Sequence, residues 1–148
     1  MKKTSILMAV VMMLLNISCV QPVYQAPYVL NGPESLLGSA ESFFSYAGVF
    51  AQIHNTSEKD IALLEIGFDV FDRTTKKNPF TGSNHITSTF AEIVYAGDTA
   101  ELCISLDSYI HAVPKETYII SNFCINSITY TDGSRWIDYL CSYNANSN

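Results

Sequence analysis

From Phe44 onward, apolar residues occur in short runs separated by polar clusters, which is the pattern of β-strands joined by turns. Ile66, Phe68 and Val70 alternate with other residues at a period of two, as in a strand with one buried face. Helix is an alternative interpretation only for residues 59–65. The predicted strands cover 44–54, 61–72, 86–95, 100–106, 117–130 and 136–140.

The connections between these runs predict how the strands are joined. Asp132-Gly133 favours a tight hairpin between the last two strands, because type I′ turns need positive φ. The turn at 96–99 predicts that 86–95 and 100–106 are antiparallel neighbours. The polar segment 73–84 is long enough to cross from one sheet to another.

These patterns favour an all-β fold, an antiparallel β-sandwich over residues 43–143, followed by a disordered tail at 144–148. The chain has 148 residues, 48% hydrophobic and 15% charged. This balance is typical of a folded domain, because disordered chains combine weak hydrophobicity with high net charge. One domain is expected.

The N-terminus has the layout of a bacterial lipoprotein signal peptide. Lys2 and Lys3 precede a charge-free apolar run from Ile6 to Leu15, too short to span a membrane. Leu15-Asn-Ile-Ser-Cys19 resembles a lipobox, although Asn16 stands where that family usually has leucine. The resemblance implies removal of 1–18 and lipidation of Cys19. The alternative is ordinary secretory cleavage, for which no A-x-A pattern stands nearby.

Residues 19–42 are predicted to be a lipidated tether. Residues 20–33 hold three prolines and no charged residue, a composition typical of an extended spacer. The lipid would bind the protein to the membrane, because two or more acyl chains give stable anchoring. We therefore expect the chain in the bacterial cell envelope. The sequence does not indicate which membrane, or which side, it faces.

Several motifs resemble those of immunoglobulin-like accessory domains of bacterial exported proteins, most of them of unknown function. They are Asn55-x-Ser-x-Lys-x-Ile61, Phe68-x-Val-x-Asp72, Gly97-Asp98 and Ile128-x-Tyr-x-Asp-Gly-Ser-x-Trp136. The resemblance covers residues 43 to 140. It implies an immunoglobulin-like sandwich and no particular chemistry.

Charge and motifs argue against several functions. The formal net charge is −6, and removal of Lys2 and Lys3 with the leader takes it to −8, which disfavours nucleic acid as a partner. Motifs of hydrolases, P-loop proteins and dinucleotide-binding proteins are missing, so we expect no enzyme and no cofactor. The three histidines, His54, His85 and His111, lie far apart, so no metal site is expected.

Three cysteines remain if Cys19 is lipidated: Cys103, Cys124 and Cys141. An odd number allows at most one intrachain disulfide. Export favours oxidation, and Cys124 with either partner would close a loop of about 17 to 21 residues. The alternative is that all three are buried thiols.

Aromatic residues gather near the C-terminus: Tyr118, Tyr130, Trp136, Tyr139 and Tyr143. Trp136, Tyr130 and Tyr139 are candidate binding residues, because exposed Tyr and Trp side chains suit sugars and protein partners. The alternative places these rings in the core, with Trp136 paired to Tyr130 across the hairpin.

We therefore expect a non-enzymatic envelope lipoprotein whose β-sandwich binds a protein or takes part in envelope assembly. A carbohydrate or peptidoglycan-binding module that uses the C-terminal aromatics is the second hypothesis. The two differ in whether an apolar patch or an aromatic shelf is exposed.

Overall fold

The computed structural model describes residues 25–145. The leader and the lipidation site Cys19 lie outside this range. The described part is all-β, and it contains no helix that could cross a membrane. Its strands are β1 (Tyr28–Leu37), β2 (Ala47–Asn55), β3 (Ile61–Phe71), β4 (His85–Phe90), β5 (Thr99–Ser105), β6 (Ile119–Tyr130) and β7 (Arg135–Ile137).

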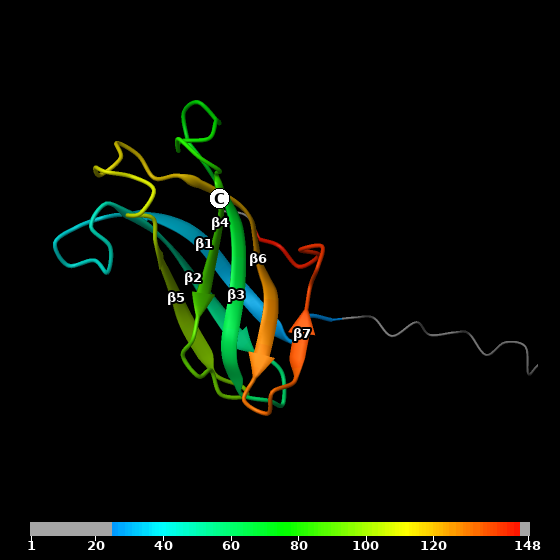
Figure 1. Ribbon diagram of the computed structural model, residues 1–148. Coiled ribbons are helices and arrows are strands. Elements are labelled where there is room, and N and C mark those ends of the chain that lie inside the picture. Colours follow the sequence, from blue (N-terminus) through cyan, green and yellow to red (C-terminus); the bar gives the residue numbers. More distant parts are fainter. Residues whose placement is uncertain (1–24, 146–148) are drawn as a thin grey trace, which may run out of the picture.

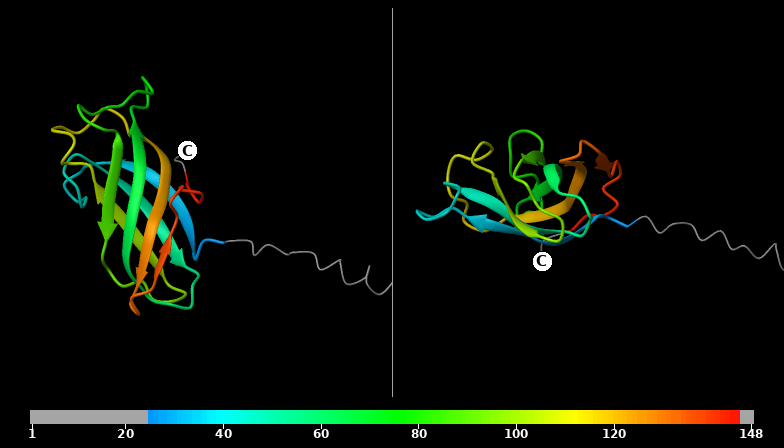
Figure 2. Two further views of the ribbon diagram at one scale, coloured as in Figure 1. Left: turned by 45° about the vertical axis from the view of Figure 1, so that its right-hand side comes forward. Right: turned by 90° about the horizontal axis from the view of Figure 1, so that it is seen from below.

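The strands form two antiparallel sheets packed face to face, which confirms the predicted β-sandwich (Figures 1 and 2). One sheet has the order β1-β2-β5 and the other β4-β3-β6-β7. Constant-type immunoglobulin domains keep the fourth strand in the first sheet, whereas here β4 pairs with β3 in the second sheet. The β6–β7 hairpin forms at Asp132-Gly133 as expected, and Gly133 has φ 80°.

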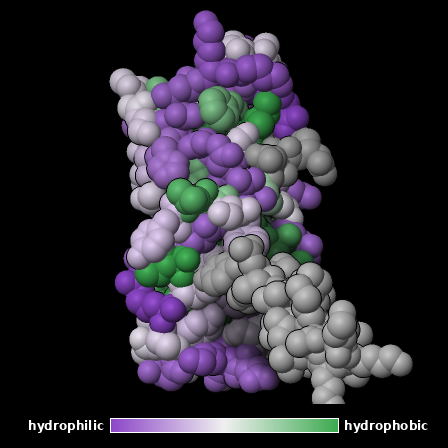
Figure 3. Space-filling model, turned by 90° about the vertical axis from the view of Figure 1, so that its right-hand side faces the viewer, coloured by the Kyte–Doolittle hydropathy of each residue, from purple (hydrophilic) through white to green (hydrophobic). Residues whose placement is uncertain are grey.

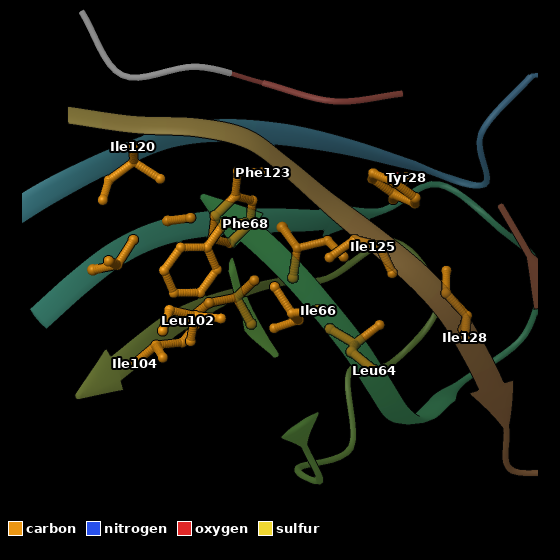
Figure 4. Packing of buried hydrophobic residues seen from close by; sticks show 14 of the residues in the cluster. Tyr28, Leu64, Ile66, Phe68, Leu102, Ile104, Ile120, Phe123, Ile125 and Ile128 are labelled. Atoms are coloured by element: carbon orange, nitrogen blue, oxygen red, sulfur yellow. The ribbon is translucent and has the colours of Figure 1, made fainter. Parts of the chain in front are cut away.

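The core lies between the sheets and follows the alternation in the sequence. In β3, Leu64, Ile66, Phe68 and Val70 are all buried. Leu64, Ile66 and Phe68 point toward the other sheet (Figure 4). Phe68 stacks on Phe123 of β6, with 5.5 Å between ring centroids. Burying each such side chain contributes about 1.5–3 kcal/mol, so this interface is the main source of stability.

The first strand corrects the predicted tether, because β1 occupies ten residues of the 19–42 range. β1 pairs with β2 from Tyr28 opposite Asn55 to Leu37 opposite Ala47, and the register shifts around Gly32 and Pro33. Proline is tolerated on an edge strand and at a bulge, where no ladder hydrogen bond is lost. The folded domain therefore begins before residue 43.

Two predicted connections are also wrong. β4 and β5 are not neighbours, because β4 pairs with β3 while β5 pairs with β2. The chain crosses between sheets at 91–98, and the segment 73–84 connects two strands of the same sheet. Alternation specifies which face of a strand is buried, and it does not specify which strand lies beside it.

Smaller differences concern the ends of elements. The range 59–65 is not helical, since β3 starts at Ile61. The last strand ends at Ile137 and does not reach residue 140. Part of the predicted disordered tail is ordered, because Ala145 exchanges two backbone hydrogen bonds with Phe123 at 2.9 and 2.8 Å.

Candidate functional site

Three long connections meet at one end of the sandwich, and we call them together the loop end (Figure 1). They are 38–46 between β1 and β2, 72–84 between β3 and β4, and 106–118 between β5 and β6. The chain enters β1 at the opposite end, where Tyr28 pairs with Asn55. Loops at the end of a β-sandwich are a common place for binding residues, because the sheets hold them in position.

Asp107 joins the first loop to the third. Its carboxylate accepts hydrogen bonds from the backbone N–H groups of Ser45 at 2.6 Å, Tyr46 at 2.8 Å and Ala47 at 3.4 Å. Desolvation alone would raise the pKa of this carboxyl group, but the three N–H donors outweigh it and lower the pKa below its ordinary value. The charged form of Asp107 therefore orders the loop 38–46.

Arg73 joins the second loop to the third. Its guanidinium donates hydrogen bonds to the carbonyls of Thr117 at 3.2 Å and Tyr118 at 3.4 Å. Beside it, the Thr74 hydroxyl donates to Glu116 at 2.9 Å. These contacts hold two loops in one fixed arrangement, which lowers the entropic cost of binding.

Asp72 closes the first turn of the loop 72–84. Its carboxylate accepts hydrogen bonds from the Thr75 backbone N–H at 2.6 Å and the Thr75 hydroxyl at 2.9 Å. These two donors, led by the backbone N–H, lower the pKa of Asp72. The turn thus keeps its form wherever the carboxylate is ionised.

Three large apolar side chains are exposed on the loops of the loop end. Phe43 is 80% exposed, Val113 is 50% exposed and Tyr109 is 42% exposed. Phe80 lies against Tyr109, with ring centroids 5.5 Å apart, beside a hollow of about 310 Å³ that His85 and His111 also line. Exposed apolar side chains on ordered loops are typical of protein-binding surfaces.

The His85 ring makes a contact within its own sheet. Its Nδ1 lies 2.8 Å from Asp69 Oδ1, and Asn122 Nδ2 donates to the other oxygen of Asp69 at 2.8 Å. Within residues 25–145, no hydroxyl or thiol hydrogen-bonds to this ring. In the same range, no three His, Cys, Asp or Glu side chains are placed to hold a metal ion.

The three predicted binding aromatics do not form a common shelf. Tyr130 is buried at 7% exposure, and Trp136 is half-buried in a T-shaped contact with Tyr28, with 5.6 Å between ring centroids. Trp136 lies opposite Ile128, so the expected pairing with Tyr130 is wrong. Tyr139 alone is fully at the surface, with 87% exposure. On this side of the molecule, apolar residues form separate spots in a mostly polar surface (Figure 3).

The cysteines resolve the alternatives that the sequence left open. Cys124 and Cys141 form a disulfide 17 residues apart, which attaches the C-terminal segment to β6. Cys103 is a free, exposed thiol on β5. The alternative that all three cysteines are buried thiols is therefore wrong.

The loop end was missed by the sequence interpretation. Phe43, Tyr109 and Val113 stand in polar segments without any period, and Asp107 lies about 60 positions from its partners. The available signal was the presence of large apolar residues inside segments rich in Ser, Lys, Asn and Pro. Such residues have no strand or helix face to fill.

The comparisons with known proteins support the fold. No protein-family model matches the chain, and the search of curated proteins gives no match. Among solved structures, a hypothetical protein of Peptoclostridium difficile 630 is similar, with a TM-score of 0.54 and 12% sequence identity. The similarity covers 78% of this chain and 88% of that one. At this identity the likeness concerns the sandwich fold alone.

Proposed function

We propose that this chain is a lipid-anchored recognition module of the bacterial cell envelope, without catalytic activity, that binds a partner protein with its loop end. The observation that carries the proposal is the position of the loop end, opposite the point where the N-terminal segment enters the fold. A lipid on Cys19 would hold the short-turn end toward the membrane. The loop end would then face away from it.

Charge supports a spacing between the domain and the membrane. The short turns at 56–60, 91–98 and 131–134 carry five carboxylates and one cation, Lys59. Anionic headgroups would repel this end, so a tether would hold the domain off the surface rather than flat against it. The three loops of the loop end carry four carboxylates and four cations, which leaves their apolar residues in a neutral setting.

The chemistry of the loop end favours a protein partner. Phe43, Tyr109 and Val113 offer apolar area, and Arg73 and Asp107 fix the loops that carry them. Interface energy comes mainly from a few well-held aromatic and apolar anchors.

The test is site-specific photo-crosslinking in cells with the full chain. A photoreactive amino acid at Phe43 or Val113 should give a discrete crosslinked species, while the same residue at Ile93 or Tyr95 should not. Ile93 and Tyr95 are 55% and 58% exposed, so they match the loop positions in accessibility. Crosslinks at the control positions alone, or at none of the four, would reject the loop end as the binding surface.

The anchor has its own test. Labelling with a clickable palmitate should tag the wild-type chain and leave Cys19→Ser untagged, and the variant should leave the membrane fraction. Equal labelling of both proteins would contradict lipidation at Cys19. Labelling of neither would indicate plain secretion.

A further inference from the structure

A second candidate site lies on the outer face of the four-stranded sheet, away from the loop end. Two adjoining hollows of about 380 Å³ and 490 Å³ share Glu65 and Asn126. Thr87 and Thr89 line the first hollow, and Arg135 and Tyr139 line the second. We call this pair of hollows the sheet groove. Their sizes fall in the usual range of small-ligand sites.

The sheet groove is produced by a glycine and a bulge. Gly67 of β3 faces outward between Thr87 and Cys124 and adds no side chain there. The register of β3 and β6 shifts beside it, and the additional residue, Asn126, lies over Gly67. A Cβ atom at Gly67 would stand 2.8 Å from Asn126 Nδ2. Bulges often direct a side chain into a functional site.

Asn126 is held on both sides. Its backbone carbonyl accepts a hydrogen bond from Asp138 N at 2.9 Å. Its side-chain Oδ1 lies 3.2 Å from Cys124 Sγ and 3.4 Å from Cys141 Sγ, against the disulfide. Nδ2 lies over Gly67 and has no hydrogen-bond acceptor among the described residues. It is a donor available to a ligand.

Glu65 supplies an acceptor beside this donor. Ser127 Oγ donates to Glu65 Oε2, and Arg135 Nη2 donates to the same oxygen at 3.2 Å. Arg135 also donates to Ser127 Oγ at 3.0 Å. Both donors reach Oε2, so Oε1 stays open as an acceptor. Arg135 balances the charge of Glu65, and Asp138, which also lines the second hollow, leaves the groove with one net negative charge.

Tyr139 provides the apolar element of the site. It is 87% exposed and lines the same hollow as Asn126 and Arg135. The Cys124–Cys141 disulfide and the Asp138–Asn126 hydrogen bond fix the segment that carries it. A rigidly placed, exposed tyrosine buries a large area on binding at low entropic cost.

We propose that the sheet groove binds a neutral oligosaccharide, with Tyr139 against a sugar ring and with Asn126 Nδ2 and Glu65 Oε1 bonded to sugar hydroxyls. The inference goes beyond the proposed protein recognition, because it concerns a different surface and does not depend on it. A hydroxyl group donates and accepts hydrogen bonds, so it matches an adjacent amide donor and carboxylate acceptor. An anionic ligand would be repelled by the net negative charge that Asp138 leaves in the groove, so a neutral ligand fits it better than an anion.

The test is ligand-observed NMR and calorimetry on the full chain in a sugar-free zwitterionic detergent. The probes are chitotriose, an N-acetylated trisaccharide, and maltotriose, which lacks the acetamido groups. Saturable binding of at least one probe is expected, and the stronger probe indicates whether the acetamido group is recognised. Asn126→Ala and Tyr139→Ala should each weaken it by about tenfold, as for loss of one good contact.

Two further variants keep the result interpretable. Thr87→Trp should abolish binding by filling the first hollow, and the Thr87 side chain makes no hydrogen bond to the described residues that its loss would break. Tyr95→Ala removes another exposed tyrosine, in the turn 91–98 and outside the sheet groove, and should bind like wild type. Absence of saturable binding by both trisaccharides at 10 mM (roughly −3 kcal/mol of binding free energy), or unchanged binding in Thr87→Trp, would overturn the proposal. Substitutions in the loop end should not alter trisaccharide binding.

Discussion

Where the chain enters the sandwich, turns of 5, 8 and 4 residues join the strands, whereas the opposite end has loops of 9, 13 and 13 residues. The two ends are also fixed in different ways. At the short-turn end the fully buried Asn55 amide bonds to backbone groups of the turns at 56–60 and 91–98. At the loop end, partly exposed charged groups such as Asp107 and Arg73 join loop to loop.

This difference separates stability from recognition. A buried amide whose hydrogen bonds are all made internally contributes to folding and offers nothing to a partner. Loops joined by solvent-facing charges leave their apolar side chains outside, where a partner can reach them. We therefore expect changes at the short-turn end to affect mainly unfolding, and changes at the loop end to affect mainly binding.

The largest expected effect follows from removing the strand that begins at the short-turn end. A fragment that starts at Glu41 lacks β1, so β2 loses its outer neighbour. It also lacks the buried Tyr28, and the Trp136 ring loses its contact with that side chain. Far-UV circular dichroism should show no cooperative thermal transition for this fragment, whereas a fragment that starts at Gln25 should melt cooperatively. Equal melting of both fragments would mean that the domain begins after β1.

That missed strand shows what the sequence could and could not predict. The β6–β7 hairpin and β3 were predictable, because Asp132-Gly133 and the alternation of Ile66, Phe68 and Val70 are local signals. β1 was not, because Gly32-Pro33 interrupts it and one of its faces is solvated. Strand partners were not predictable either, because they depend on packing between distant segments.

The candidate site was harder to predict than the fold. The sequence drew attention to the C-terminal aromatics, yet Tyr130 lies in the core and only Tyr139 is fully exposed. The loop end is built by contacts such as Asp107 with Ser45, 62 positions apart, which no periodicity encodes. The sheet groove depends on a bulge at Asn126, which a regular strand pattern conceals.

The second prediction compares one asparagine from each end. Asn55 Nδ2 donates to the carbonyls of Lys59, Val94 and Tyr95 at 2.8, 3.1 and 3.2 Å. Each carbonyl keeps one other donor, but Asn55→Ala would remove these bonds from a fully buried site and leave the Ser57 N–H without its Oδ1 acceptor. We expect a cost of about 2–4 kcal/mol in the free energy of unfolding. Urea denaturation of the two proteins measures this difference.

Asn78 at the loop end is the matched control. It makes a similar turn, with Nδ2 donating to Gly82 O at 2.7 Å and Oδ1 accepting from Phe80 N at 2.8 Å, but it is exposed. Water can replace these partners, so Asn78→Ala should cost less than about 1 kcal/mol. If both asparagines cost the same, the proposed division between the ends fails.

The two ends can also be compared through the pH dependence of stability, because each contains a carboxylate with a lowered pKa. Backbone N–H donors lower the pKa of Asp107 against desolvation, and Lys59, at 2.8 Å, lowers the pKa of Asp132 at the short-turn end. A lowered folded pKa contributes stability above the unfolded value of about 3.9, and this contribution is lost as pH falls through the folded pKa. Both carboxylates should therefore stabilise the protein at neutral pH.

The measurement is the melting temperature of Asp107→Asn and Asp132→Asn against wild type from pH 7 to pH 2. Each difference should be constant above about pH 5 and shrink at lower pH. Added salt should reduce the Asp132 difference more, because an exposed ion pair is screened and backbone hydrogen bonds are not. A difference that grows as pH falls would contradict the assigned direction of either pKa shift.

The smallest effect on stability is expected at Phe43, where the effect on binding should be greatest. Its side chain is 80% exposed, so Phe43→Ser removes almost no buried area and should change the free energy of unfolding by less than about 0.5 kcal/mol. The same change should strongly reduce crosslinking from Val113, because one anchor of the shared surface is gone. Tyr95→Ser, at the short-turn end, should leave both quantities unchanged. A Phe43→Ser protein that melts clearly below wild type would place this ring in the packing of the domain, and undiminished crosslinking from Val113 would remove Phe43 from the binding surface.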